Sequence, residues 1–413
     1  MRRIHVMAAV IRRADGCILI AKRPDAAHQG GLWEFPGGKL EAGEPRLAGL
    51  TRELSEELGI QVTCAHPLID IRHDYPDKSI RLDVWSVSVF TGVAHGAEGQ
   101  QVRWVEPQEL GQYAFPAANR PIVAAATLPR RYLITPDGTD AECLMAGLEI
   151  ASGLGVRMVQ LRQTGLSQLE YDRLAEALMD RFGDVFVWIL KGEQPPLNGA
   201  GWHVTGRQLR ALHGAGWCKG GPIAAGPPLP QGSESDGVGE LGLEPIAAGP
   251  PLPQSSESTA GVEYAQSGWE RRPESDEVGE LGLEPIAAGP PLPQGSESTA
   301  GVEYAQSGWE RRPRRDGVVW NGLLAASCHD AEELQMAAEI GADFVTLSPV
   351  LPTQSHPGAP HLGWSRAAEL IELANMPVYL LGGLNANDLD QAQAIGAQGV
   401  AGISGLWPGN ASS

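Results

Sequence analysis

The 413-residue sequence contains little cysteine, few aromatic residues and no long apolar run. Its five cysteines are far apart, and none forms a CxxC pair: Cys17, Cys64, Cys143, Cys218 and Cys328. Isolated thiols fit a reducing cytosol better than a disulfide framework. No stretch approaches the roughly 20 consecutive apolar residues of a membrane span, so we expect a cytoplasmic protein that does not enter a membrane.

Positive charge is also scarce. The chain carries 31 Lys and Arg against 50 Asp and Glu, which gives a formal net charge of −19. Binding to a nucleic-acid polymer requires clustered basic side chains, so we do not expect such a partner. A free nucleotide accompanied by a metal ion is a different case, because the metal neutralises the phosphates locally.

The length predicts two domains. Residues 1–128 alternate strand-like runs, such as HVMAAVI and LDVWSVSVF, with one strong helical segment, PRLAGLTRELSEELG. The apolar start mimics a signal peptide, but Arg12, Arg13 and Asp15 follow it directly. We therefore interpret it as a first β-strand.

Residues 130–219 and 315–413 alternate short apolar strands with helical patterns. The eight candidate strands are RYLITP (131–136), MVQLRQ (158–163), VFVWIL (185–190), GWHVTG (201–206), GLLAASCH (322–329), FVTLSPV (344–350), VYLLGGL (378–384) and GVAGISG (399–405). Eight strand–helix units in about 190 residues predict a compact (β/α)8 TIM barrel.

Residues 220–314 interrupt this barrel with an insert rich in Pro, Gly, Ser and Glu. A run containing PIAAGPPLPQ is duplicated from Glu240 and from Glu280. The composition predicts a disordered segment, which buries too little surface to offset its ordering entropy. A docking linker anchored by Trp269 and Trp309 and a tolerated duplicated insertion both explain it. The insert follows a helical stretch, on the barrel face opposite the one that carries active sites.

The chemistry of the first domain is concentrated in one predicted helix. Glu53, Glu56 and Glu57 are spaced i, i+3 and i+4, so a helix places the three carboxylates on one face. Like charges this close repel each other, and a hard divalent cation with oxygen ligands removes that cost. The leucines expected on the opposite, buried face are Leu47, Leu50, Leu54 and Leu58.

Residues around this helix complete the pattern. The glycines of FPGGK, Gly37 and Gly38, let a backbone carbonyl approach the ion. Arg52 can orient a carboxylate through charge-assisted hydrogen bonds, and Gly59 is suited to end the helix. A solvated acidic helix face would explain a lone ExxEE motif but not this whole frame.

The stretch from Gly38 to Ile60 resembles the Nudix box, GX5EX7REUXEEXGU with U aliphatic, at every defined position. The resemblance implies an α/β/α sandwich with a mixed sheet, Mg²⁺ or Mn²⁺ as cofactor, and hydrolysis of nucleoside diphosphates linked to another group. A carboxylate-held water would attack phosphorus. The residues implied for metal binding are Gly37, Glu53, Glu56 and Glu57, with Arg52 in the catalytic set and Gly38 and Glu44 towards the substrate.

Further segments of residues 1–128 resemble, in order, those of the MutT-type 8-oxo-dGTP diphosphatases: AKRPDAAHQGGLWEFPGGKLEAGE, RHDYPDKSIRLDVWSV, GAEGQQVRWV and FPAANRPIVAA. In that subgroup the Asn of FPxAN reads the modified purine, which implies this role for Asn119. An amide suits it, because it presents a donor and an acceptor together. The implied reaction converts 8-oxo-dGTP to 8-oxo-dGMP and pyrophosphate, which prevents replication errors.

The same resemblance assigns three more residues. Phe35 would wall the base, Arg23 would contact the nucleotide, and Glu98 would supply a further metal-site carboxylate and a base. Plainer alternatives stay open for three positions: a helix N-cap for Asn119, simple core packing for Phe35 and a solvated loop for Glu98.

The barrel sequence resembles the thiamine phosphate synthase and TenI family, through YLIT, VQLRQ, WHVTGRQL, GADFVTLSPVLPTQS, VYLLGGLN and GVAGIS. Glycine amides at the last strand ends build phosphate sites in many barrels, although barrel geometry alone also explains such glycines. The resemblance implies that the barrel binds a phosphorylated, thiamine-related ligand through Gln160, Arg162, Thr353, Gly383 and Ser404.

Departures from that family argue against synthase catalysis. Gln163 replaces the usual lysine, and Ala200 and Gln208 replace two aspartates, so no Mg²⁺ site for a pyrophosphate substrate is evident. His329 and His356 are expected to be structural rather than catalytic. Three alternatives to 8-oxo-dGTP hydrolysis remain: hydrolysis of a thiamine-pathway pyrophosphate, thiamine phosphate synthesis, and a barrel that only binds or regulates.

Overall fold

The computed structural model describes residues 3–26, 29–76, 78–196, 198–220, 320–353, 358 and 360–408. Residues 221–314 of the predicted insert lie outside the described residues, as does His356. The described parts of both predicted domains belong to one compact unit. None of the helices in these described ranges is long and apolar enough to cross a lipid bilayer.

The N-terminal domain is built on two small sheets. Its described strands are β1 (Ile4–Ile11), β2 (Ile18–Lys22), β3 (Trp33–Glu34), β4 (Gln61–Asp74), β5 (Ser79–Thr91) and β6 (Val102–Val105). They form the sheets β1-β5-β4 and β3-β2-β6. β1 runs parallel to β5 and β4 runs antiparallel to it, so the first sheet is mixed, as predicted.

Two helices cover the faces of this mixed sheet. They are α1 (Arg46–Leu58) and α2 (Arg120–Thr127), with the 3₁₀ helices η1 (Pro107–Gln112) and η2 (Ala117–Asn119) before α2. Side chains alternate between the two faces along β1. Met7, Ala9 and Ile11 pack with α1, whereas Ala8 and Val10 pack with residues of α2.

The predicted catalytic helix forms as expected, with one exception in its buried face. Gly59 follows α1 with a left-handed φ of 67°, which confirms its predicted role. Leu50, Leu54 and Leu58 are fully buried. The prediction for Leu47 was wrong, because its side chain is 45% exposed. Leu47 has the correct helical angle, but in the first turn it meets no packing partner that covers it.

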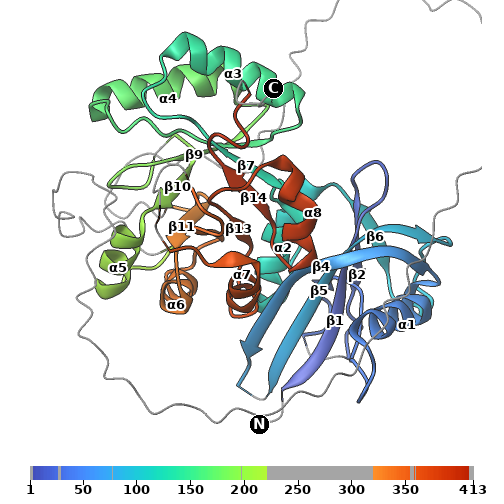
Figure 1. Ribbon diagram of the computed structural model, residues 1–413. Helices are drawn as coiled ribbons and strands as arrows, with labels where there is room; N and C mark the ends of the chain where they lie inside the picture. Colours follow the sequence, from blue (N-terminus) through green and yellow to red (C-terminus); the bar gives the residue numbers. More distant parts are fainter. Residues whose placement is uncertain are drawn as a thin grey trace, which may run out of the picture. The chain divides into compact units, whose positions relative to one another are not determined.

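The C-terminal domain is a closed parallel barrel, which confirms the predicted fold class. Its strands are β7 (Arg131–Ile134), β8 (Met158–Gln160), β9 (Val187–Leu190), β10 (Gly201–Val204), β11 (Leu324–Cys328), β12 (Phe344–Leu347), β13 (Val378–Leu380) and β14 (Gly399–Gly402). Each lies inside its predicted segment. β10 pairs directly with β11 across the insert, so green and orange strands meet in Figure 1.

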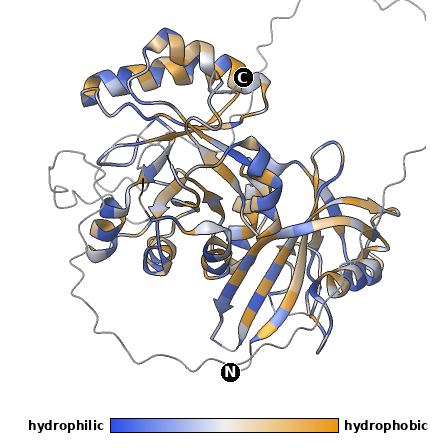
Figure 2. Cartoon of the chain, in the orientation of Figure 1, coloured by the Kyte–Doolittle hydropathy of each residue, from blue (hydrophilic) through white to orange (hydrophobic). Residues whose placement is uncertain are grey.

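Helices follow most of these strands. The described ones are α3 (Ala141–Gly153), α4 (Gln168–Phe182), α5 (Gly206–Gly214), α6 (Ala331–Glu339), α7 (Gly363–Ile371) and α8 (Leu389–Ala394), with the 3₁₀ helix η3 (Ala386–Asp388) before α8. Figure 2 shows hydrophobic and hydrophilic residues side by side on α3 and α4. No helix lies between β9 and β10 in the described residues 191–196 and 198–200, so the strand–helix repeat is incomplete there.

Aromatic and polar layers fill the barrel interior. The ring of Phe344 meets Tyr132 and Tyr379 edge-on, with centroids 5.5 and 5.4 Å apart. His203 shares hydrogen bonds with the Tyr132 hydroxyl at 3.0 Å and the Ser327 hydroxyl at 2.9 Å. Burial lowers the pKa of His203 to about 3, so the imidazole is neutral in the folded protein.

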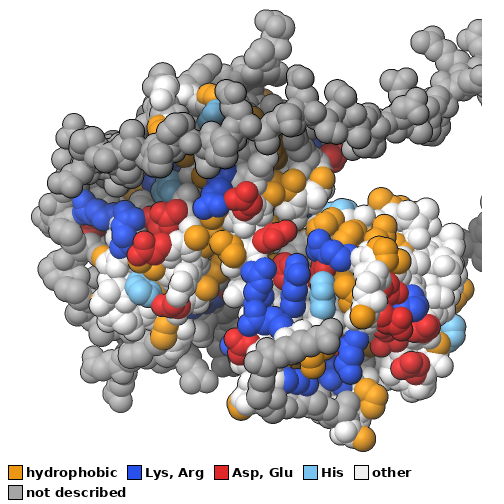
Figure 3. Space-filling view, turned by 60° about the horizontal axis from the view of Figure 1, so that its bottom comes forward, with side chains coloured by type: hydrophobic (Ala, Val, Ile, Leu, Met, Phe, Trp, Pro, Cys, Tyr) orange, Lys and Arg blue, Asp and Glu red, His pale blue; other side chains and the backbone are white. Residues whose placement is uncertain are grey.

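Charge is unevenly distributed over the surface. Figure 3 shows groups of Lys and Arg side chains lying next to Asp and Glu side chains on one face. A chain with a net charge of −19 therefore still carries groups of basic side chains on this face (Figure 3).

Candidate functional site

Residues 35–39, the glycine turn, are held against the first strand by backbone hydrogen bonds. The Met7 amide donates to the Gly38 carbonyl at 2.8 Å, and the Ala9 amide donates to the Pro36 carbonyl at 2.9 Å. A Cβ atom on Gly37 would collide with the Met7 carbonyl, and one on Gly38 would collide with the Glu53 carboxylate. Gly37 is therefore required for this turn to lie so close to β1, and the absence of a side chain on Gly38 leaves room for the Glu53 carboxylate.

Arg52 is the centre of a charged network on α1. Its guanidinium donates to both carboxylate oxygens of Glu44, at 2.9 and 3.0 Å, and to Glu53 at 2.9 Å. These bonds raise the pKa of Arg52 and lower the pKa of Glu44. Arg52 thus fixes the orientation of the Glu53 carboxylate, as predicted from its position beside the acidic cluster.

Glu57 extends from the same helix into a crowded acidic environment. Its carboxylate accepts a hydrogen bond from the Gly37 amide at 3.1 Å. Burial, followed by the negative charges of Glu34, Glu53 and Glu98, raises the pKa of Glu57 to about 7. Carboxylates from three parts of the chain therefore act on one group near the glycine turn.

The exposed Glu98 lies on a loop that is tied to the end of α1. The Ala97 amide and the Gln100 side-chain amide both donate to the Glu57 carbonyl at 2.9 Å. Within the loop, the Glu98 amide donates to the Gln100 side chain at 3.0 Å. These contacts connect the Glu98 loop with the helix, but its exposure leaves the solvated-loop interpretation open.

Glu34 is a site residue that the sequence analysis missed. Glu34 is the last residue of β3, directly before Phe35, and its negative charge helps to raise the pKa of Glu57. Burial raises the pKa of Glu34, while its ion pair with Arg23 opposes that shift. The available signal was its place beside FPGGK, but only the fold brings β3 next to α1. Arg23, predicted to contact the nucleotide, lies beside this acidic cluster.

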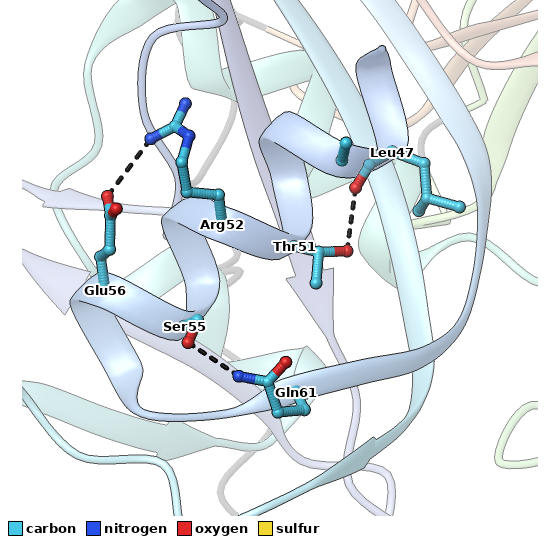
Figure 4. A pocket seen from close by; sticks show the side chains of 7 residues that line it. Leu47, Thr51, Arg52, Ser55, Glu56 and Gln61 are labelled. Atoms are coloured by element: carbon cyan, nitrogen blue, oxygen red, sulfur yellow. Dashed lines mark hydrogen bonds and ion pairs between the residues drawn. The ribbon is translucent and has the colours of Figure 1, made fainter. Parts of the chain in front are cut away.

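Glu56 is the exposed member of the three glutamates predicted to bind metal. Its carboxylate accepts from Arg52 at 3.2 Å, and its side chain is 57% exposed. Figure 4 shows this contact together with the Thr51–Leu47 and Ser55–Gln61 hydrogen bonds, among residues that line a surface pocket. The three glutamates of the predicted metal site thus divide into two partly buried members, Glu53 and Glu57, and one exposed member.

The described residues contain no group of three Asp, Glu, His or Cys side chains already close enough to hold a metal ion. The carboxylates of Glu53 and Glu56 accept hydrogen bonds from Arg52, and the Glu57 carboxylate accepts one from the Gly37 amide. The donor set is nevertheless composed of carboxylate oxygens and a backbone carbonyl, which suit Mg²⁺ or Mn²⁺. Mutual repulsion around Glu57 is the kind of cost that a bound cation removes.

An aromatic cluster lies on the opposite face of the mixed sheet. Phe35 stacks on Phe115 with ring centroids 5.4 Å apart, and Trp33 meets Tyr113 edge-on at the same distance. Phe35 is only 3% exposed and belongs to the α2-side core, so its packing role is evident.

Asn119 borders this cluster through its neighbour Ala118, which belongs to the same core. It occupies the N-cap position of α2, but its side chain makes no capping hydrogen bond. The residue is 8% exposed. Its backbone amide donates to the Pro116 carbonyl at 2.9 Å, but no hydrogen bond of its side-chain amide is found among the described residues. A helix-capping function therefore does not account for this buried amide.

Comparison with known proteins agrees with this geometry. Residues 7–125 match the NUDIX domain family. Over 125 residues the chain is 41% identical to the CTP pyrophosphohydrolase of Escherichia coli K12. The aligned region covers 30% of this chain and 92% of that protein. The chain belongs to the Nudix family. Its Nudix domain is also 35% identical over 124 residues to the 8-oxo-dGTP diphosphatase of the same organism, covering 30% of this chain and 96% of that protein.

The second domain has relatives of its own. Residues 301–406 match the thiamine monophosphate synthase family, so a domain similar to these synthases follows the Nudix domain. The chain is 42% identical over 84 residues to the putative thiamine-phosphate synthase 2 of Aquifex aeolicus, covering 20% of this chain. That match spans only 45% of the Aquifex protein.

The predicted ligand residues of the barrel lie at one end of it. Gln160 ends β8 and Arg162 follows it, while Thr353, Gly383 and Ser404 come after β12, β13 and β14 respectively. Carboxyl ends of parallel strands meet at the same rim. The Gln160 side-chain nitrogen is buried without a hydrogen-bond partner among the described residues.

The residues that depart from the synthase pattern have structural contacts. The Gln163 side chain donates to the Pro136 carbonyl at 2.7 Å, and Gln208 forms a capping box with Thr205 at the start of α5. His329, expected to be a structural histidine, shares a 2.8 Å contact with Glu333, which also pairs with Arg210. These contacts account for the three side chains without a substrate.

Proposed function

We propose that the Nudix domain hydrolyses 8-oxo-dGTP to 8-oxo-dGMP and pyrophosphate, and so keeps oxidised guanine out of replicating DNA. The observation that carries this proposal is the side-chain amide of Asn119, which makes no capping hydrogen bond in a residue that is 8% exposed. An amide that is not engaged by the protein can donate to and accept from one purine edge. The aromatic pair Phe35 and Phe115 offers an apolar wall nearby.

The proposed cofactor is Mg²⁺, with Mn²⁺ as a substitute. Its ligands would be the Gly37 carbonyl and the carboxylates of Glu53, Glu56, Glu57 and Glu98. When bound, such an ion polarises the phosphate chain of the substrate. In this scheme Arg52 holds Glu53 in place, and Glu98 accepts a proton from the water that attacks phosphorus.

Arg23 would meet the nucleotide phosphates, and Gly38 and Glu44 would shape the approach to the site. Arg23 is already close to Glu34, so a substrate phosphate would compete with that carboxylate for the guanidinium. Glu44 acts through Arg52, to which it makes two hydrogen bonds. We therefore regard Glu44 as a positioning residue in this scheme.

A second candidate substrate is a cytidine nucleotide. The relative named CTP pyrophosphohydrolase is 41% identical to this chain, against 35% for the Escherichia coli 8-oxo-dGTP diphosphatase. The two candidates differ in the hydrogen-bonding edge that the base presents, so Asn119 is the residue at which they can be separated.

The test is a substrate screen of the full chain with Mg²⁺, comparing 8-oxo-dGTP, dGTP, CTP and thiamine pyrophosphate. Asn119→Ala should lower kcat/KM for 8-oxo-dGTP by about 10-fold or more, the usual cost of an unpaired buried hydrogen-bonding group. Gln61→Ala, at the exposed first position of β4, is the matched control and should have no effect. Fastest turnover of CTP, with no response to Asn119→Ala, would favour the cytidine substrate instead.

For the barrel we propose binding of a phosphorylated, thiamine-related ligand at the rim that carries Gln160, Arg162, Thr353, Gly383 and Ser404. The family match and the unpartnered Gln160 nitrogen support it. Assays of the full chain for thiamine phosphate synthesis and for binding of thiamine phosphate separate a catalytic barrel from a binding barrel. We expect binding without synthesis, because Gln163 and Gln208 are committed to structural hydrogen bonds.

A further inference from the structure

Three arginines line a pocket whose described lining shares no residue with either site described above. The pocket has a volume of about 560 Å³, and its lining includes Arg12, Arg130 and Arg157. Arg12 directly follows β1, Arg130 directly precedes β7, and Arg157 directly precedes β8. The barrel arginines thus lie at the amino ends of their strands, whereas the proposed thiamine-related ligand would bind at the carboxyl ends.

None of these guanidinium groups forms an ion pair with a carboxylate in the described parts of the chain. Arg12 donates to the carbonyls of Gly16 and Ala126, at 3.1 and 2.7 Å. Arg130 contacts His66 at 3.2 Å and donates to the Ser86 hydroxyl at 3.3 Å. Each contact uses donor capacity, but none supplies negative charge.

Arg157 repeats this arrangement with two backbone carbonyls. It donates to Ser152 at 2.8 Å and to Val156 at 2.7 Å. The one acidic residue in the described lining is Asp184, which is exposed and forms no ion pair with any of the three arginines. In a chain with 50 acidic residues, such an uncompensated group of arginines is unexpected.

The cost of this arrangement is greatest where the arginines are half-buried. Burial lowers the pKa of Arg12, and burial together with the positive charge of Arg12 lowers the pKa of Arg130. The two groups therefore repel each other across the pocket. An anion placed between them would remove both the repulsion and part of the desolvation cost.

We infer that this pocket binds a small phosphate-bearing molecule, whose negative charge compensates Arg12, Arg130 and Arg157. Guanidinium groups carry five donors in a fork that matches phosphate oxygens, and each of these arginines uses only some of them. The volume is within the range of small-molecule sites. Leu128, Pro129 and Phe186 also line the pocket and would contact the organic part of the ligand.

The experiment is calorimetric titration of the full chain in chelator-containing buffer at constant ionic strength. The probes are inorganic phosphate, pyrophosphate and deoxyguanosine monophosphate. We expect saturable binding of at least one probe, weakened about 10-fold or more by Arg130→Gln and by Arg12→Gln, because each removes a charged donor. Arg13→Gln is the matched control: Arg13 is adjacent in sequence but already pairs with Asp15. Its affinity should equal that of the native chain.

These variants leave the Nudix glutamates, Gly383 and Ser404 unchanged, so a binding event that they remove belongs to this pocket. A second measurement is the melting temperature with and without the bound probe. The probe should raise it in the native chain and in Arg13→Gln, but not in Arg130→Gln. If Arg130→Gln does not fold, Arg12→Gln and Arg157→Gln decide the question. Absence of saturable binding to the native chain, or unchanged affinity in the pocket variants, would overturn the inference.

Discussion

The carboxylate of Glu57 accepts a hydrogen bond from the Gly37 amide at 3.1 Å, which joins α1 to the glycine turn. The neighbouring Glu53 fills the space that a side chain on Gly38 would need. Two residues four apart on one helix therefore each meet one glycine of FPGGK. This pairing explains why the acidic helix and the glycine turn belong to one functional unit.

Replacing Glu53 by Gln should lower turnover of the nucleotide substrate by about 100-fold or more, because the proposed metal site loses a charged oxygen ligand. The fold should persist, since Glu53 is not part of the apolar core. Steady-state kinetics and circular dichroism measure the two effects. A variant with native turnover would contradict the assignment of Glu53.

Gly38→Ala should also reduce turnover, because the added methyl group would occupy the position of the Glu53 carboxylate. The matched control is Gly111→Ala, at which an added Cβ meets no atom within 4 Å. We expect a clear loss of kcat in the first variant and native kinetics in the second. Equal activity of the two would show that the approach of Glu53 to the turn does not matter.

Removal of divalent metal should abolish hydrolysis, and Mg²⁺ or Mn²⁺ should restore it. Oxygen donors of this kind bind hard cations, and a bound cation would offset the repulsion around Glu57. The measurement is the hydrolysis rate after dialysis against a chelator, followed by titration of each ion. Full activity in the dialysed protein would refute a metal-dependent reaction.

Leu54→Ala should lower the free energy of unfolding by about 2–5 kcal/mol, the usual cost of truncating a buried leucine. Leu54 is fully buried, whereas Leu47 on the same helix is 45% exposed. Leu47→Ala should therefore change stability by less than about 0.5 kcal/mol. Urea unfolding curves of the two variants, measured side by side, compare the costs directly.

His203 should make the barrel less stable as the pH falls. Its pKa is about 3 in the folded protein, while an exposed histidine titrates near 6.5. Between these values the unfolded chain binds a proton that the folded chain does not, so this contribution is complete above about pH 6.5 and is lost below it, at up to about 1.4 kcal/mol per pH unit. His203→Gln should show a shallower decline in urea midpoint between about pH 6.5 and 5. An identical slope in both proteins would contradict the buried, neutral state.

Local pattern was sufficient for most of the secondary structure. The apolar spacing predicted α1 and every barrel strand, because helices and buried strands leave distinct periods in a sequence. It failed at Leu47, since a period gives an angle around the helix but not the presence of a covering partner. The absent helix after β9 shows the same limit, because the repeat suggested by the alternation is not continued there.

The residues of the candidate site were likewise predicted only in part from the sequence. The spacing of Glu53, Glu56 and Glu57 was readable, and so was the need for glycine in FPGGK. Sequence did not reveal that Glu56 is exposed while Glu53 and Glu57 are partly buried beside the glycine turn, since burial depends on tertiary contacts such as that of Glu57 with Gly37. Glu34 escaped notice because its approach to Glu57 depends on strand pairing.

The sequence by itself determined the Nudix box, the barrel and their order, because each is encoded by short-range spacing of apolar, acidic and glycine residues. Only the tertiary structure decided which polar groups are left without partners. The Arg12 guanidinium donates to the Ala126 carbonyl and Arg130 donates to the Ser86 hydroxyl, so each has a partner more than 40 residues away in the chain. Asn119 follows Ala118, whose core cluster also contains Phe35. Burial and charge compensation are properties of surroundings in space, and spacing along the chain does not specify them.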